Sequence, residues 1–146
     1  MSKISKLHRY YRKDIRKQPY VWFVFGDNFE RIGFGGQAKE ARGESNSIGI
    51  PTKISPSRFL DDSDETYEKF SKYLEDALYV MENDVLKYGY GLVFPSDGVG
   101  TGLADLENKA PKCWKLLDEK LLEFLMKHAG VEKISELPDE NELYWF

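Results

Sequence analysis

Two glycine-rich turns, each directly after an uninterrupted apolar run, constrain the fold of this chain more than any other feature. The first turn spans residues 26–38 and follows Tyr20–Phe25. The second spans residues 96–103 and follows Gly91–Phe94. Short runs that are apolar on both faces are typical of buried strands in a sheet covered on both sides. Because ligands bind beyond the carboxyl ends of such strands, both turns are candidate binding loops.

The rest of the chain alternates between strands and helices. Ser47–Pro51 predicts another strand that ends at its proline, and residues 52–60 predict a loop. A short helix is expected over residues 36–42, and Leu143–Phe146 predicts a last strand. We therefore expect a single α/β domain over residues 1–146, with three α/β/α layers and a mixed central sheet.

Two long helices are expected to cover the sheet. Residues 67–85 carry an apolar stripe with helical spacing, capped by Asp62 and Glu65 and stopped at Gly89. The second helix is expected to begin near Asn108. Both helices would pack their apolar stripes onto the sheet.

The first 18 residues form a basic segment on an acidic body. They hold seven Lys or Arg against Asp14, a net charge of +6, whereas the whole chain has −4. Such a segment can act as an arm that contacts a nucleic-acid backbone or another polyanion. The alternative is a solvated helix covering part of the core, with four residues turned inward: Leu7, Tyr10, Tyr11 and Ile15.

Composition excludes several classes of protein. No apolar run approaches the roughly 18 residues of a membrane span, and no signal-peptide pattern opens the chain. Cys113 is the only cysteine, which rules out an intrachain disulfide and favours a cytoplasmic protein. The chain has only two histidines, His8 and His128, which together with one cysteine are too few for a zinc site. We therefore expect neither a metal nor a cofactor. No Gly-x-Ser-x-Gly motif of a serine hydrolase is present.

The first glycine turn has the composition of a phosphate or ribose site. Glycine lets a ligand approach the main chain, and a helix start offers free N–H groups to anions. Asp27 and Asn28 suit a ribose hydroxyl or an amide, or else they bond their own backbone in a simple turn. The predicted ligand-binding residues of this turn are Gly26, Asp27, Asn28, Gly33, Phe34, Gly35, Gly36 and Gln37.

The second glycine turn can wrap main-chain N–H groups around a diphosphate. Its alternating glycines lack both the lysine of a Walker loop and the Gly-x-Gly-x-x-Gly of a dinucleotide fold. The predicted ligand-binding residues here are Ser96, Gly98, Val99, Gly100, Thr101, Gly102 and Leu103, together with Thr52.

Lys53 lies just beyond the strand that ends at Pro51. It can neutralise a phosphate, act as a nucleophile if burial depresses its pKa, or be an ordinary exposed lysine.

The order of these motifs resembles the macrodomain, an ADP-ribose-binding α/β/α module. The likeness covers residues 22–53 and 66–121 and is nearest to the terminal ADP-ribose protein glycohydrolases and the DNA ADP-ribosylation antitoxins. Residues 25–53 also resemble small phage-encoded proteins, which would place the chain in a host cytoplasm. The early strand-Gly-Asp motif that often holds adenine in macrodomains is missing.

The resemblance implies roles for particular residues. Lys53 falls where the glycohydrolase lysine attacks the anomeric carbon of the distal ribose. Ala104 occupies the place nearest to the aspartate that assists release, so Asp105 or Asp97 would take that role. Three functions stay open: hydrolysis of an ADP-ribosyl linkage on protein or DNA, binding of ADP-ribose or a related nucleotide signal without turnover, and association with nucleic acid through the basic arm.

Overall fold

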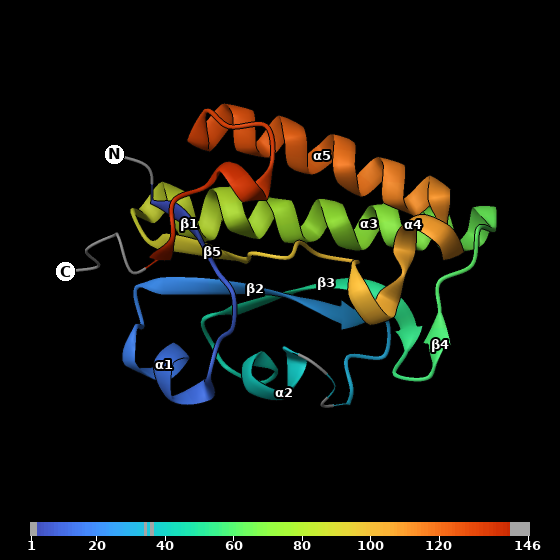
Figure 1. Cartoon of the computed structure of the whole chain (residues 1–146), viewed down its shortest axis with the longest axis horizontal. Helices are drawn as coiled ribbons and strands as arrows, with labels where there is room; N and C mark the ends of the chain where they lie inside the picture. The colour runs from blue at the N-terminus through green and yellow to red at the C-terminus, as the bar shows by residue number, and fades with distance from the viewer. Residues whose placement is uncertain (1–2, 34, 36, 141–146) are drawn as a thin grey trace.

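The computed structural model describes residues 3–33, 35 and 37–140, and within them it shows a mixed, mostly parallel sheet between two helical layers (Figure 1). The strand order is β1-β5-β2-β3-β4, and only the β3–β4 pairing is antiparallel. The expected α/β class with a mixed, covered sheet is thus confirmed. The strands are β1 (Ile4–Leu7), β2 (Val21–Asn28), β3 (Ser47–Ser55), β4 (Arg58–Phe59) and β5 (Gly91–Pro95).

One face of the sheet carries an upper layer and the other a lower layer, as Figure 1 draws them. The upper layer holds α3 (Asp64–Val80), α4 (Leu106–Lys109) and α5 (Pro111–Ala129), and the lower layer holds α1 (Arg12–Lys17) and α2 (Ala38–Ala41). A π-helical turn (Met81–Val85) and three 3-10 turns (Leu86–Tyr88, Gly102–Ala104 and Ile134–Glu136) complete the described elements. None of the described helices has the length and apolar character needed to cross a membrane.

Side chains on opposite faces of β2 enter two separate cores. Val24 joins a large core with Phe70 and Leu74 of α3. Phe23 and Phe25 face a smaller core with Tyr10 and residues of the lower layer. This alternation explains why β2 is apolar at every position from Val21 to Phe25.

The basic N-terminal segment is not one helix, as its periodicity had suggested. Residues 4–7 form the edge strand β1, in which Ile4 pairs with Leu92 of β5. Only residues 12–17 are helical, with Ile15 buried, whereas Tyr11 is 45% exposed. Four strand residues are too few to show a period of two, and pairing with β5 overrides the helical spacing.

The strand containing Pro51 does not end there. It continues to Ser55 and turns into β4, so the predicted loop is wrong for residues 52–55 and 58–59. Pro51 lies opposite Asp27, where the register of the β2–β3 pairing shifts. A bulge of this kind tolerates a residue that cannot donate to the ladder.

Two helix starts differ from the expectation. Ser63, not Asp62, caps α3, because its side chain accepts a hydrogen bond from the backbone N–H of Thr66. The helix expected near Asn108 is two helices, since Pro111 begins α5 and lacks the N–H needed to continue α4. The predicted stop at Gly89 is confirmed by its left-handed φ of 79°. The strand predicted over residues 143–146 lies outside the described part.

Candidate functional site

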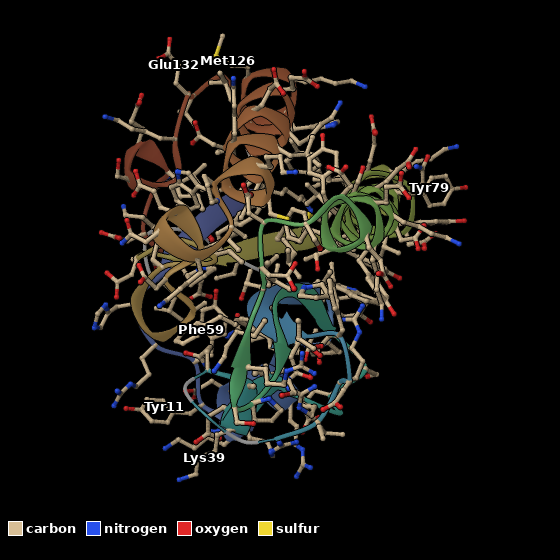
Figure 2. The ribbon with its side chains drawn as sticks, turned by 90° about the vertical axis from the view of Figure 1, so that its right-hand side faces the viewer. Tyr11, Lys39, Phe59, Tyr79, Met126 and Glu132 are labelled. Carbon is tan, nitrogen blue, oxygen red and sulfur yellow. The ribbon has the colours of Figure 1, made fainter. Side chains whose placement is uncertain are left out.

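The candidate site is a cavity of about 320 Å³ at the carboxyl edge of β2, β3 and β5. The chain leaves β2 toward the lower layer and leaves the adjacent β5 toward the upper layer (Figure 1). Neighbouring strands whose connections diverge in this way leave a crevice between their ends, which is where open α/β sheets bind ligands. Figure 2 looks onto this edge, with Phe59 of β4 between Lys39 of the lower layer and Met126 of α5.

The cavity collects most of the predicted binding residues from both turns. The predicted residues that line it are Gly26, Asp27, Asn28, Gly33, Gly35, Gln37, Thr52, Lys53, Gly98, Val99, Gly100 and Thr101. The remaining lining residues were not among the predicted binding residues, although Ile32 and Ala38 lie within the first glycine turn: Ile32, Ala38, Arg42, Pro56, Pro95 and Ala104. Ser96 and Gly102 are outside this lining. Phe34, Gly36 and the side chain of Leu103 lie outside the described part.

The loop after β5 needs its glycines. Gly98, Gly100 and Gly102 have φ values of 88°, 81° and 62°, in the left-handed region that other residues avoid. A Cβ on Gly100 would lie 2.9 Å from Leu106 Cδ2, so the loop packs closely on α4. Within the described residues, the N–H groups of Val99, Gly100 and Thr101 donate no hydrogen bond, which leaves them for a ligand.

The loop after β2 is shaped by Gly33 and Asn28. Gly33 has a φ of 93°, and a Cβ there would lie 2.7 Å from Pro56 Cγ. The side-chain amide of Asn28 donates to the carbonyl oxygen of Ile32 at 2.7 Å. Asn28 therefore holds its own loop, as in the simple-turn alternative, while it also lines the cavity.

Asp27 is a buried carboxylate between two arginines. Its Oδ1 lies 2.6 Å from Arg42 Nη1, and its Oδ2 accepts a hydrogen bond from Arg31 Nη1 at 2.8 Å. The Asp27 side chain is only 4% exposed and that of Arg42 14%. In the described part, Asp27 is the one carboxylate lining the cavity, against the two cations Arg42 and Lys53, so the lining has a net positive charge.

Lys53 reaches the cavity but has partners of its own. Its Nζ donates to the carbonyl oxygen of Pro56 and lies 5.2 Å from the centroid of the Phe59 ring. These contacts hold the ammonium group beside the loop that follows β3. A cation in this position can pair with a phosphate.

The structure does not bring the two proposed acid/base residues to the cavity. Asp97 is 77% exposed, and its Oδ2 lies 3.6 Å from His8 Nδ1. Asp105 has a left-handed φ of 45° and accepts a hydrogen bond from Asn108 Nδ2 at 2.7 Å. Neither residue lines the cavity that contains Lys53.

Gln37 links the site to the lower layer. Its side-chain amide makes two 2.9 Å hydrogen bonds with the backbone N–H and carbonyl of Tyr10. It thereby fixes the start of α2, whose first residue, Ala38, also lines the cavity.

Among the lining residues that the sequence did not predict, Arg42 at the end of the same helix has the largest consequence, because it brings a cation to the cavity. The one signal that could have indicated Arg42 is its place at the end of the short helix that follows the first glycine turn.

Other reactive groups are not placed for catalysis. No cluster of three or more His, Cys, Asp or Glu that could hold a metal is found in the described residues. Cys113 is buried in α5, and this burial raises its pKa to about 11. At neutral pH the thiol is therefore protonated and a poor nucleophile.

The chain belongs to a family of unknown function (DUF7831), whose model matches residues 5–120. The matched segment includes both glycine turns, Lys53 and Arg42. Comparison with curated proteins and with solved structures gave no match.

Proposed function

We propose that this protein binds ADP-ribose, or a closely related nucleotide diphosphate, in the cavity at the carboxyl edge of the sheet. The observation that carries the proposal is that one cavity is lined both by the left-handed glycine loop after β5 and by two cations, Arg42 and Lys53. Main-chain N–H groups and cations together are the usual ligands of phosphate groups. The order of motifs, which resembles that of macrodomains, supports a diphosphate with a ribose beside it.

The volume and the polarity of the cavity suit part of such a ligand. About 320 Å³ is near the lower end of the roughly 300–1,000 Å³ typical of small-ligand pockets. Gly26 and Gly35 line the cavity without side chains, so a sugar ring can approach the backbone there. The ribose is expected beside Asn28 and Lys53, and the diphosphate along residues 98–101.

Binding without turnover is the version of the proposal that the geometry supports best. Hydrolysis needs a group that protonates the leaving oxygen or activates water within hydrogen-bond reach. Asp97 and Asp105 are both outside the cavity lining, and Asp27 is paired with two arginines. A lysine-assisted hydrolase, with Lys53 attacking the anomeric carbon, remains the alternative that an assay must test.

Titration calorimetry with ADP-ribose tests the binding proposal. Gly26 is the best place for a variant, because its φ is not left-handed and a Cβ there would meet Thr52 Oγ1 at an ordinary 3.6 Å. We expect Gly26→Glu to bind ADP-ribose about tenfold more weakly than the isosteric Gly26→Gln, a difference of roughly 1.4 kcal/mol. No heat with the wild-type protein, at millimolar ADP-ribose, sinks the proposal.

A product assay separates binding from hydrolysis. An ADP-ribosylated peptide and an ADP-ribosylated DNA duplex are incubated with wild-type protein and with Lys53→Ala, and free ADP-ribose is measured by chromatography. We expect no release by either protein. Release by the wild type that disappears in Lys53→Ala would establish the lysine-assisted hydrolase instead.

A second candidate function, association with nucleic acid, is favoured by the separation of charge. Residues 1–45, which include the lower layer, hold ten Lys or Arg and five Asp or Glu, whereas the whole chain has a net charge of −4. Lys13 and Lys17 are exposed one helical turn apart on α1, and both lie two positions from the buried Ile15. They therefore project away from the core.

Salt dependence of duplex binding tests this second candidate. Lys13→Glu/Lys17→Glu is expected to abolish binding that weakens steeply with salt. Lys69→Glu/Lys72→Glu makes the same change in charge on the upper layer and serves as the control. If both double variants lose the same duplex affinity, or if the affinity does not depend on salt concentration, this second candidate function is excluded.

A further inference from the structure

The three charged side chains Arg31, Asp27 and Arg42 form a cluster, which we call the arginine cluster, at one side of the cavity. We propose that Arg42 is the side chain that contacts the phosphate, and that Asp27 orients Arg42 and does not touch the ligand. This inference rests on the proposed function, because it assumes that the cavity takes a phosphate. It reassigns Asp27, which the sequence offered as a partner for a ribose hydroxyl.

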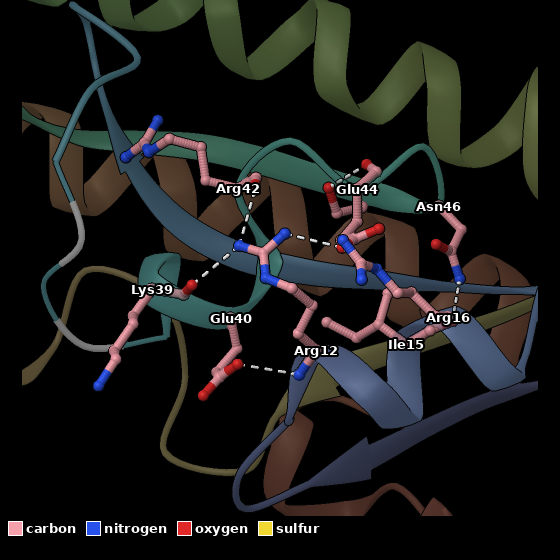
Figure 3. A network of polar contacts seen from close by, with 9 residues as sticks. Arg12, Ile15, Arg16, Lys39, Glu40, Arg42, Glu44 and Asn46 are labelled. Carbon is pink, nitrogen blue, oxygen red and sulfur yellow. Dashed lines mark hydrogen bonds and ion pairs between the residues drawn. The ribbon is translucent and has the colours of Figure 1, made fainter.

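Arg42 is held in one orientation by several contacts. Besides the Asp27 carboxylate, its Nε donates to the carbonyl oxygen of Gly33 at 2.9 Å. Its own carbonyl oxygen accepts a hydrogen bond from Arg12 Nη2 at 3.1 Å, which ties its backbone to α1 (Figure 3). A guanidinium group has five N–H donors, and these contacts within the described residues use two of them. The other three are left for an oxyanion.

The charge in the arginine cluster is incompletely balanced. One carboxylate, Asp27, lies between two guanidinium groups, and Lys53 adds a further cation to the same cavity. A cation that is 86% buried, as the Arg42 side chain is, loses most of its hydration. An arriving anion restores the balance, and a planar fork of donors matches the geometry of phosphate oxygens.

The backbone around the cluster is shaped to fit it. A Cβ on Gly49 of β3 would lie 2.5 Å from Asp27 Oδ2 and 3.0 Å from Arg31 Nη1, so only glycine leaves room for the ion pair. The carbonyl oxygen of Gly49 also accepts a hydrogen bond from Arg31 Nη1 at 3.2 Å. Arg31 itself has a left-handed φ of 57°, which is unfavourable for a residue with a side chain.

These features argue for an orienting role for Asp27. Both of its oxygens are occupied: Oδ1 by Arg42 and the backbone N–H of Asn28, and Oδ2 by Arg31. A carboxylate in direct contact with a phosphate would repel it, so its presence in an anion site needs another purpose. Holding a guanidinium group with its free donors toward the cavity is such a purpose.

The direction in which one substitution changes the affinity for anions distinguishes an orienting role of Asp27 from a purely electrostatic one. Asp27→Asn removes a negative charge from an anion site, so long-range electrostatics alone predicts tighter binding of inorganic pyrophosphate and of ADP-ribose. Orientation predicts weaker binding of both, by about tenfold, because Arg42 loses its charged partner. Titration calorimetry measures the affinities, and thermal unfolding verifies that the variant is folded.

Four further variants keep the test decisive if Asp27→Asn does not fold. Arg42→Gln is expected to weaken pyrophosphate binding about 10- to 100-fold, whereas Lys39→Gln, which makes the same change in charge on the exposed side of the same helix, should change it less than threefold. Arg42→Lys should restore only part of the loss, because it lacks the fork. Gly49→Ala changes no charge and does not line the cavity, yet it should weaken binding by crowding Asp27 and Arg31.

The outcomes distinguish this inference from the proposed function. If ADP-ribose gives no heat but pyrophosphate binds and depends on Arg42, the choice of nucleotide is wrong and the role of Arg42 stands. If ADP-ribose binds and Arg42→Gln equals wild type, the inference is overturned and the binding proposal stands. Tighter binding by folded Asp27→Asn overturns the orienting role.

Discussion

The upper and lower layers are attached to the same sheet by different means. In the upper layer, α3 has 17 residues and α5 has 19, and each buries a continuous apolar stripe. In the lower layer, α1 has six residues and α2 has four. Helices this short are not stable in isolation, because the conformational entropy lost on forming the first turn exceeds the free energy gained from its few hydrogen bonds.

In the lower layer, polar contacts hold the short helices in place, where the upper layer relies on long apolar stripes (Figure 3). Arg12 joins Glu44 at 2.7 Å and donates to the carbonyl oxygens of Lys39 and Arg42. Asn46 donates to three backbone carbonyls at one end of α1. The position of Arg42, and with it the proposed phosphate site, therefore depends on a few hydrogen bonds.

The largest effect is expected from removing a large side chain of the upper core. Phe70 is fully buried between α3 and the sheet, and Phe70→Ala should lower the free energy of unfolding by about 3–5 kcal/mol. Urea denaturation measures this loss. Tyr79→Ala, an exposed position of the same helix, should stay within about 0.5 kcal/mol of wild type. A loss below about 1 kcal/mol in Phe70→Ala would show that the upper layer does not depend on its apolar stripe.

A smaller effect is expected from removing a polar contact of the lower layer. Asn46 is buried, and its Nδ2 donates to the carbonyl oxygens of Ile15, Gln18 and Val21 at 2.8, 3.1 and 2.9 Å. Asn46→Ala removes all three bonds, while the carbonyls of Ile15 and Gln18 keep their backbone donors, the N–H groups of Gln18 and Val21. The loss should destabilise the protein by about 1–3 kcal/mol.

The loss of stability in Asn46→Ala should be confined to the lower layer. In Asn46→Ala, amide hydrogen exchange should accelerate in α1 more than in α3. Asn83→Ala removes an exposed 3.1 Å hydrogen bond to the Tyr79 carbonyl and is the matched control, with little expected change. Uniform acceleration in both layers would mean that the lower layer has no separate means of attachment.

The sequence predicted the upper layer better than the lower one for a physical reason. The stripe over residues 67–85 repeats often enough for its period to be read, and Gly89 ends it as expected. In the lower layer, α2 spans only four residues. For residues 1–18 the sequence left an arm or a helix open, and neither alternative included the strand β1. Short elements held by tertiary hydrogen bonds carry no periodic signal.

The same limit applies to the candidate site. Glycine turns after apolar strands are local features, so the sequence located both walls of the cavity and Lys53. The pairing of Asp27 with Arg42 joins residues that only the folded lower layer brings together. The placement of Asp97 and Asp105 outside the cavity depends on loop conformation, including the left-handed φ of Asp105. Spacing along the chain does not encode that conformation.

The smallest predicted effect concerns the N-terminal end of α3. Asp61 Oδ1 accepts hydrogen bonds from the Ser63 side chain, from Thr66 Oγ1 at 2.6 Å and from the backbone N–H of Ser63 at 3.1 Å. These bonds, that of the Ser63 side chain first, lower the pKa of Asp61 to about 2. A carboxylate whose pKa is lower in the folded than in the unfolded chain, where it is about 3.9, stabilises the fold above that unfolded value.

This contribution should be lost as the pH falls from about 4 through about 2, where Asp61 becomes protonated in the folded state as well. Asp61→Asn should therefore melt below wild type at pH 5–7, and the two melting temperatures should converge as the pH approaches 2. Asp76→Asn, on the exposed side of the same helix, should show no such convergence. A gap between wild type and Asp61→Asn that stays constant down to pH 2 would mean that the ionised carboxylate contributes nothing, and that α3 is attached by its apolar stripe alone.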